Sequence, residues 1–159
     1  MKAIMMSIRP QHVAKILNGE KTIEIRKKFP KDYVGWIYLY ITKGKPTLYF
    51  NNKKSFVDIG EQLPTINGKV VARFWCDKVD SFDWYQVDEE LCALSCLTEK
   101  QLEDYVGSGI AYAIHINDLE IFDKPKEISE FKHLTCRNCK TQFIRPLTRA
   151  PESYCYVEV

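Results

Sequence analysis

Short apolar segments follow one another closely in this chain, and most of the gaps between them have room only for turns. Segments rich in β-branched and aromatic residues predict strands at residues 2–8, 21–27, 36–42, 68–79, 110–122 and 153–159. A parallel crossover needs about a dozen residues or more, usually as a helix, so crossovers cannot repeat along this chain. The pattern therefore predicts an α+β fold, with a small, mostly antiparallel sheet or barrel and peripheral helices.

Three short helices are expected beside this sheet. The first spans residues 10–17, where a proline suits the first turn and apolar residues recur at helical spacing. The other two lie within 87–96 and 97–107, and Asp88 and Thr98 are their expected N-caps because short polar side chains accept from the first free N–H groups. A brief further helix is expected near Ile128. The helices should lie at the periphery of the sheet.

Length and composition favour one soluble domain spanning residues 1–159. The chain is 45% hydrophobic and 28% charged, as in ordinary globular proteins. No stretch approaches the roughly 20 apolar residues that cross a bilayer, and the first residues do not form a signal peptide. Six cysteines without a secretory segment favour reduced thiols or metal ligands. We therefore expect a cytoplasmic protein with no membrane partner.

Charge is distributed unevenly along the chain. Residues 9–31 hold seven basic and two acidic side chains, and residues 132–149 hold five basic side chains and no acid. Residues 77–104 hold nine acidic and two basic side chains. Clustered basic segments attract phosphate backbones, although solvated faces also vary in charge without any such partner. Both interpretations remain open on charge alone.

A charged strand follows the first helix. In a regular strand Thr22, Glu24 and Arg26 share one face, while Ile23 and Ile25 point to the core. An exposed ion pair between Glu24 and Arg26 would contribute only about 0–1 kcal/mol, so stability explains it poorly. Either the charges belong to a solvated strand or they form a site.

The stretch "SIRPQHVAKILNGEKTIEIRKKFP", with its G-x-K-x-x-E-x-R pattern, resembles the signature of ASCH domains. "GKVVARFWCDKV", "YAIHINDLEIFDKPKEISEF" and "PLTRAPESYCYVEV" also resemble ASCH proteins of bacterial and prophage origin, and the likeness is weakest over residues 43–68. ASCH domains are a branch of the PUA-like fold, a small β-barrel with helices associated with RNA recognition. The resemblance implies that Lys21 joins Glu24 and Arg26 in one cleft, which requires a bend just after Gly19.

Two classes of function follow for this cleft. The first is binding of RNA or of a modified nucleotide, in which Arg26 offers a planar fork to a phosphate or to an acceptor on a base edge. The second is a small hydrolase acting on a nucleoside, a nucleotide or RNA, with Lys21 and Glu24 as catalytic residues. Some ASCH relatives hydrolyse acetyl amides of modified cytidine, and others cleave RNA. The amidohydrolases carry a threonine nucleophile at the position of Glu24, a role that glutamate cannot fill.

Four further residues are candidates for ligand contact. Ser7 and Arg9 end the first strand beside the expected cleft. Arg149 and Tyr154 lie in "TRAPESYCY", a stretch that the resemblance covers, and an arginine on a loop can contact phosphate. The expected partner is RNA or a nucleotide. No cofactor motif is present, and the sequence does not indicate an oligomeric state.

The cysteines leave one alternative open. Cys136 and Cys139 have the spacing of a zinc-binding pair, with His133 and Cys155 as further possible ligands. A second C-x-x-C pair, which would strengthen the pattern, is absent from the sequence. Reduced thiols in a loop are the more common case, and we assign no metal.

Overall fold

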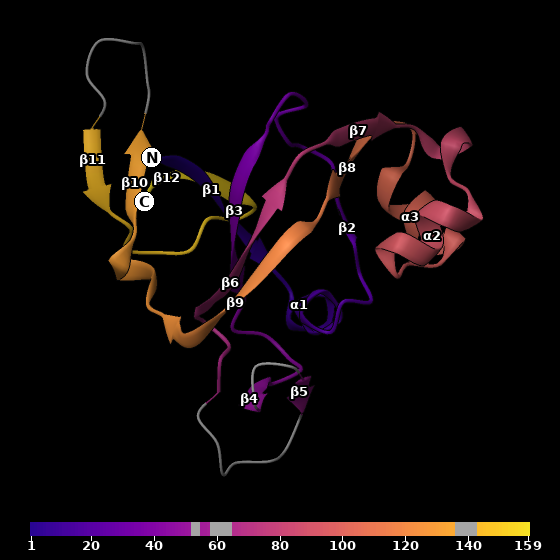
Figure 1. The fold of residues 1–159 in the computed structure, drawn as a ribbon. Coiled ribbons are helices and arrows are strands. Elements are labelled where there is room, and N and C mark those ends of the chain that lie inside the picture. The colour runs from indigo at the N-terminus through magenta and orange to yellow at the C-terminus, as the bar shows by residue number, and fades with distance from the viewer. Residues whose placement is uncertain (52–54, 58–64, 136–142) are drawn as a thin grey trace.

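A mixed seven-stranded sheet is the largest element of the computed structural model, which describes residues 1–51, 55–57, 65–135 and 143–159 (Figure 1). Its strands are β1 (Lys2–Ile8), β3 (Gly35–Ile41), β6 (Val70–Cys76), β9 (Asn117–Lys126), β10 (Lys132–Thr135), β11 (Phe143–Pro146) and β12 (Tyr154–Glu158). The order across the sheet is β11-β10-β12-β1-β3-β6-β9. Strands β1 and β3 pair in parallel, and the other neighbours are antiparallel.

A second sheet carries the charged strand. It consists of β2 (Ile23–Arg26), β8 (Ala111–His115) and β7 (Val79–Phe82), in the order β2-β8-β7. Strands β6 and β7 follow each other closely, as do β8 and β9, so two long segments of chain contribute to both sheets. The sequence predicted one strand for each of these segments. The structure divides each segment into two strands, and Asp118 adopts a positive φ of 44° near the second break.

The α+β class is confirmed, and the closed barrel is not seen. Among the described residues the large sheet has two free edges, at β11 and at β9, and the small sheet ends at β2 and β7. Strands β4 (Tyr49–Asn51) and β5 (Ser55–Val57) pair antiparallel. Strands β10 and β11 were not predicted, because their sequences, KHLT and FIRP, lack the apolar alternation of a core strand.

The helices form where their signals predicted them. Helix α1 (Pro10–Leu17) begins at its proline, and Asp88 caps α2 (Glu89–Ser95) by accepting from the N–H of Leu91 at 2.8 Å. Thr98 caps α3 (Glu99–Val106) in a reciprocal capping box with Gln101. The described part of the chain also contains the 3-10 turns η2 (Trp84–Gln86) and η3 (Ile128–Glu130). In the described part of the chain, no helix combines the length and apolarity needed to cross a bilayer.

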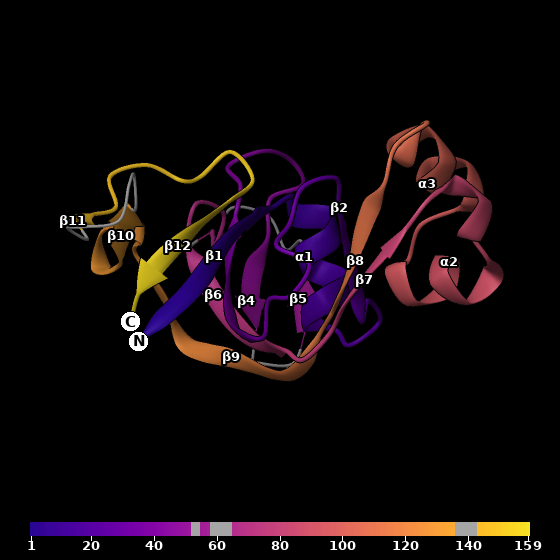
Figure 2. The ribbon, with the colours of Figure 1, turned by 90° about the horizontal axis from the view of Figure 1, so that it is seen from above.

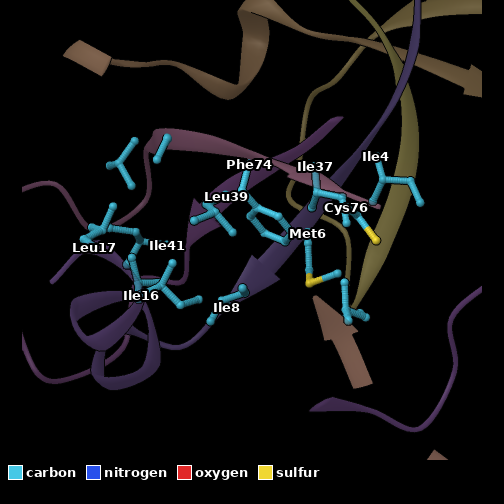
Figure 3. Packing of buried hydrophobic residues seen from close by; sticks show 14 of the residues in the cluster. Ile4, Met6, Ile8, Ile16, Leu17, Ile37, Leu39, Ile41, Phe74 and Cys76 are labelled. Atoms are coloured by element: carbon cyan, nitrogen blue, oxygen red, sulfur yellow. The ribbon is translucent and has the colours of Figure 1, made fainter. Parts of the chain in front are cut away.

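The core fixes the position of β2. Helix α1 packs Ile16 and Leu17 against one face of the large sheet, beside Ile41 (Figure 3). Helices α2 and α3 gather beyond β7 and β8, at the end of the molecule far from β10 and β11 (Figures 1 and 2). Ile23 and Ile25 of β2 are buried against this helix pair. The alternate residues of β2 therefore face back toward α1 and the end of β1.

Candidate functional site

A cleft of about 670 Å³ lies where α1, β2, the end of β1 and the α2–α3 pair meet. Six charged side chains line it: Arg9, Lys15, Lys21 and Arg26, with Glu24 and Glu152. Its other lining residues are Ser7, Ile8, Gln11, His12, Ile25, Thr42, Cys96, Leu97, Gln101 and Tyr105. The lining thus combines polar and apolar side chains, and its charged residues are more often positive than negative.

The turn between α1 and β2 places Lys21 at the base of this cleft. Gly19 adopts a φ of +77°, which favours glycine, and the chain reverses there. The N–H groups of Glu20 and Lys21 then both donate to the carbonyl oxygen of Lys15, at 2.9 and 3.1 Å. The N–H of Thr22 donates to the carbonyl oxygen of Leu94 in α2 at 2.9 Å. Lys21 is therefore held between the ends of two helices.

The side chain of Lys21 is buried, with the whole residue only 2% exposed. Its Nζ donates to the carbonyl oxygen of Ser95 at 2.6 Å and lies 3.4 Å from Oε2 of Glu24. Ser95 ends α2, where free carbonyl groups carry partial negative charge and favour a cation. The burial of Lys21 thus has two compensating partners, one on a helix and one on the neighbouring strand.

Glu24 and Arg26 extend the same set of contacts toward β1. Glu24 is buried, and its Oε1 accepts from Nε of Arg26 at 3.1 Å. Arg26 also donates from Nη2 to the carbonyl oxygen of Ser7 at 2.7 Å, and from Nη1 to Oγ of Ser153 at 3.4 Å. We call Lys21, Glu24 and Arg26 the charged row. Through Arg26 the charged row joins the small sheet to the end of a central strand of the large sheet.

His12 of α1 lines the cleft beside the charged row. Burial lowers the pKa of its imidazole below the usual value of 6.5, an effect that the nearby Glu24 carboxylate partly opposes. The cations Lys21, Lys15 and Arg9 lower the pKa further. The imidazole is therefore neutral at pH 7, so it can donate through one ring nitrogen and accept through the other.

The structure brings together five of the seven residues that the sequence singled out. Ser7, Arg9, Lys21, Glu24 and Arg26 all line this cleft. The Ser7 hydroxyl donates to the carbonyl oxygen of Pro151 at 2.7 Å, so it fixes the loop before β12.

The other two predicted residues lie elsewhere. Neither Arg149 nor Tyr154 is among the described residues that line the cleft. Arg149 is exposed, and the ring of Tyr154 packs against that of Phe29 with centroids 5.3 Å apart. The ring of Tyr154 therefore belongs to an aromatic contact with the core.

Sequence reasoning missed several lining residues. Gln11, His12 and Lys15 belong to the polar side of α1, and their spacing opposite its apolar residues is a signal that could have found them. Gln101 and Tyr105 come from α3, about 80 residues after β2 in the chain, and no local pattern connects them with it. Glu152 was missed for the same reason.

The structure describes only part of the possible zinc site that the cysteine spacing suggested. Cys136 and Cys139 lie outside the described residues. Cys155 is half-buried in β12, and burial raises the pKa of its thiol to about 11.

Comparison with known proteins identifies the fold. No protein-family model matches the chain, and no curated protein matches it. Solved structures do match, and three of them are an ASCH protein from Zymomonas mobilis and two of its point mutants. They are 18 to 19% identical to this chain, cover 79 to 80% of it over 73 to 77% of their own length, and superpose with TM-scores of 0.57 to 0.59. The chain has the fold of ASCH proteins, as the sequence resemblance predicted.

Proposed function

We propose that this protein is an ASCH-family domain that binds RNA, or a modified nucleotide, in the cleft beside the charged row. The cleft volume of about 670 Å³ lies within the range of about 300–1,000 Å³ in which proteins hold small ligands. Its lining carries four cationic side chains against two carboxylates, which suits a ligand that bears phosphate. The fold shared with ASCH proteins supports the same assignment.

One observation carries the proposal: three charged side chains lie in a row along this cleft, two of them buried and the third, Arg26, half-buried. The side chains of Lys21, Glu24 and Arg26 are 1%, 8% and 13% exposed. Removing charges from water costs several kcal/mol per ion, and well-packed apolar residues often stabilise a fold equally well. Stability is therefore a weak reason for such a row. A better reason is that the row binds a ligand, which requires cations and a carboxylate held in fixed positions.

The rim of the cleft supplies cations that the protein leaves available. Arg9 and Lys15 are exposed, and neither side chain has an ion pair within the described part of the chain. Cations of this kind bind phosphate and release counterions, which makes binding strongly dependent on salt. In this proposal Arg9 and Lys15 contact the backbone phosphates, while the inner part of the cleft holds one nucleotide.

Titration with short single-stranded RNA and with nucleoside monophosphates, at several salt concentrations, tests this function. Arg9→Ala and Lys15→Ala should each weaken RNA binding and reduce the salt slope by about one unit. Lys124→Ala is the matched control, because Lys124 is exposed on β9 and does not line the cleft. Equal affinities and equal slopes for all four proteins would refute the proposal.

A small hydrolase is the second candidate function. It would use Lys21 and Glu24 of the charged row as its catalytic residues. Nζ of Lys21 lies 3.4 Å from Oε2 of Glu24 in a cleft that His12 also lines. A carboxylate in this position can take a proton from an attacking water molecule. Incubating RNA and nucleosides with the wild type and with Glu24→Gln distinguishes the two functions. A hydrolase loses turnover in this variant, whereas a binding domain shows no turnover in either protein.

A further inference from the structure

The geometry points to Glu152 as the residue that determines ligand specificity in this cleft, by accepting a hydrogen bond from a neutral donor on the bound nucleotide. The donor is either an exocyclic amine of the base or a hydroxyl of the ribose. This inference rests on the proposed function, and it assigns a role to a residue that the charged strand and its motif do not include.

Both neighbours of Glu152 are fixed to the wall of the cleft. The carbonyl oxygen of Pro151 accepts from Oγ of Ser7 at 2.7 Å, and the carbonyl oxygen of Ser153 accepts from the N–H of Ser7 at 2.9 Å. Oγ of Ser153 also accepts from Arg26 at 3.4 Å. Two hydrogen bonds to backbone carbonyls and one to the Ser153 side chain therefore hold the residues on either side of Glu152 against the end of β1 and the charged row. These contacts fix the backbone of Glu152 at the cleft wall, so its carboxylate can reach only the part of the cleft nearest to it.

The two carboxylates of the cleft differ in what they already contact. Glu24 is buried between Lys21 and Arg26. Glu152 is exposed at the cleft, and its side chain has no hydrogen bond or ion pair with any other described residue. Its acceptor sites are therefore available to a ligand, although cationic side chains line the same cleft.

An ionised carboxylate only accepts hydrogen bonds, and its charge repels phosphate. Glu152 is thus unsuited to the phosphate of a nucleotide and suited to an N–H or O–H group elsewhere on it. Glutamate accepts from the amine of cytosine in known base recognition, and a correct pair of this kind discriminates by roughly tenfold or more. A nucleotide that places a hydrogen-bond acceptor or a C–H group opposite Glu152, in place of the N–H or O–H donor, lacks this hydrogen bond.

Isothermal titration with matched nucleotides tests the inference. One pair, AMP and purine riboside 5′-monophosphate, differs in a single exocyclic amine. A second pair, AMP and its 2′-deoxy form, differs in a single ribose hydroxyl. CMP and UMP extend the comparison to pyrimidines. Each ligand is titrated into the wild type, Glu152→Gln, Glu152→Ala and the control Glu103→Ala, whose residue is exposed on α3 and does not line the cleft.

We expect the wild type and Glu103→Ala to prefer one member of a pair by roughly tenfold. In Glu152→Ala this preference should fall to less than about twofold. Loss of the amine preference identifies a base contact, and loss of the hydroxyl preference identifies a ribose contact. Glu152→Gln keeps the size of the side chain and provides the same test if the alanine variant unfolds.

Two outcomes overturn the inference and differ in what they say about the proposed function. If the wild type binds nucleotides and Glu152→Ala keeps every preference, or gains affinity equally for all ligands, Glu152 has no role in specificity and the binding function stands. If the wild type binds no nucleotide or RNA at all, both the inference and the proposed function fail.

Discussion

Nζ of Lys21 lies 2.6 Å from the carbonyl oxygen of Ser95, the last residue of α2, and this contact joins the charged row to the helical wall of the cleft. The N–H of Thr22 makes a parallel connection to Leu94 at 2.9 Å. Cys96 and Leu97, which follow directly, line the cleft. The position of that wall therefore depends on the same lysine that contacts Glu24.

Lys21→Met should lower the free energy of unfolding by about 1–3 kcal/mol or more, because it leaves the buried carbonyl of Ser95 without its donor and the buried Glu24 carboxylate without one of its two cations. Methionine fills a similar volume, so the loss reports these two missing polar contacts more than a cavity. Urea denaturation followed by circular dichroism measures it. Lys15→Met is the control, because Lys15 lines the same cleft but is exposed. Equal stability of the two variants would contradict this account of Lys21.

Arg26→Ala should destabilise the fold by about 3 kcal/mol, because it leaves the buried carboxylate of Glu24 with one partner fewer. It also removes the donor to the carbonyl oxygen of Ser7. From the sequence alone Arg26 reads as a surface residue, whose loss costs less than about 0.5 kcal/mol. Thermal and urea unfolding distinguish the two values. Arg26→Lys keeps the charge but not the planar fork, and it should recover only part of the loss.

The charged row illustrates what the sequence could predict. Helix α1 and strand β2 follow from local signals, namely a proline at the start, a glycine turn and alternating isoleucines. The bend that brings Lys21 to Glu24 was expected from the family resemblance. The burial of the row was not expected, because its partners Ser95 and Ser153 lie 74 and 127 residues away in the chain. Contacts at such separations leave no local pattern.

The sheets show the same contrast between features that local sequence predicts and features that depend on long-range contacts. Each strand that the sequence predicted forms where its apolar residues lie, because burial of those residues drives its pairing. The sequence did not indicate that residues 68–79 and 110–122 each divide between two sheets. That division is set by the partner strands: Ala113 pairs with Ile25 of β2, and Ile121 pairs with Ala72 of β6. The number of sheets therefore depends on which distant strands pair with each other, and a local sequence pattern does not show this.

Acidification should destabilise the wild type more than the variant His12→Gln. Burial lowers the pKa of His12 in the folded protein below its unfolded value of about 6.5. The stability linked to this group is therefore present above about pH 6.5 and is lost as pH falls toward the lowered pKa. Urea unfolding at pH 8 and at pH 5 measures the loss for each protein. An identical change in the two proteins would show that His12 titrates normally.

Acetylcytidine should be hydrolysed weakly or not at all by this protein. The sequence resemblance implies that ASCH relatives which cleave this amide use a threonine hydroxyl as nucleophile, and it matches Glu24 to that position. The oxygens of Glu24 are already engaged, one by Arg26 at 3.1 Å and the other near Lys21 at 3.4 Å. Thr22, the hydroxyl nearest in sequence, is exposed and does not line the cleft.

Chromatography of acetylcytidine after incubation with the wild type, Lys21→Ala and Lys124→Ala checks this expectation, with background hydrolysis measured without protein. We expect all three proteins to match the background rate. A robust rate that survives in Lys124→Ala and disappears in Lys21→Ala would show that the charged row performs the amide hydrolysis without the threonine. In that case a water molecule activated by Glu24 would have to replace the hydroxyl nucleophile, and the hydrolase would become the better assignment.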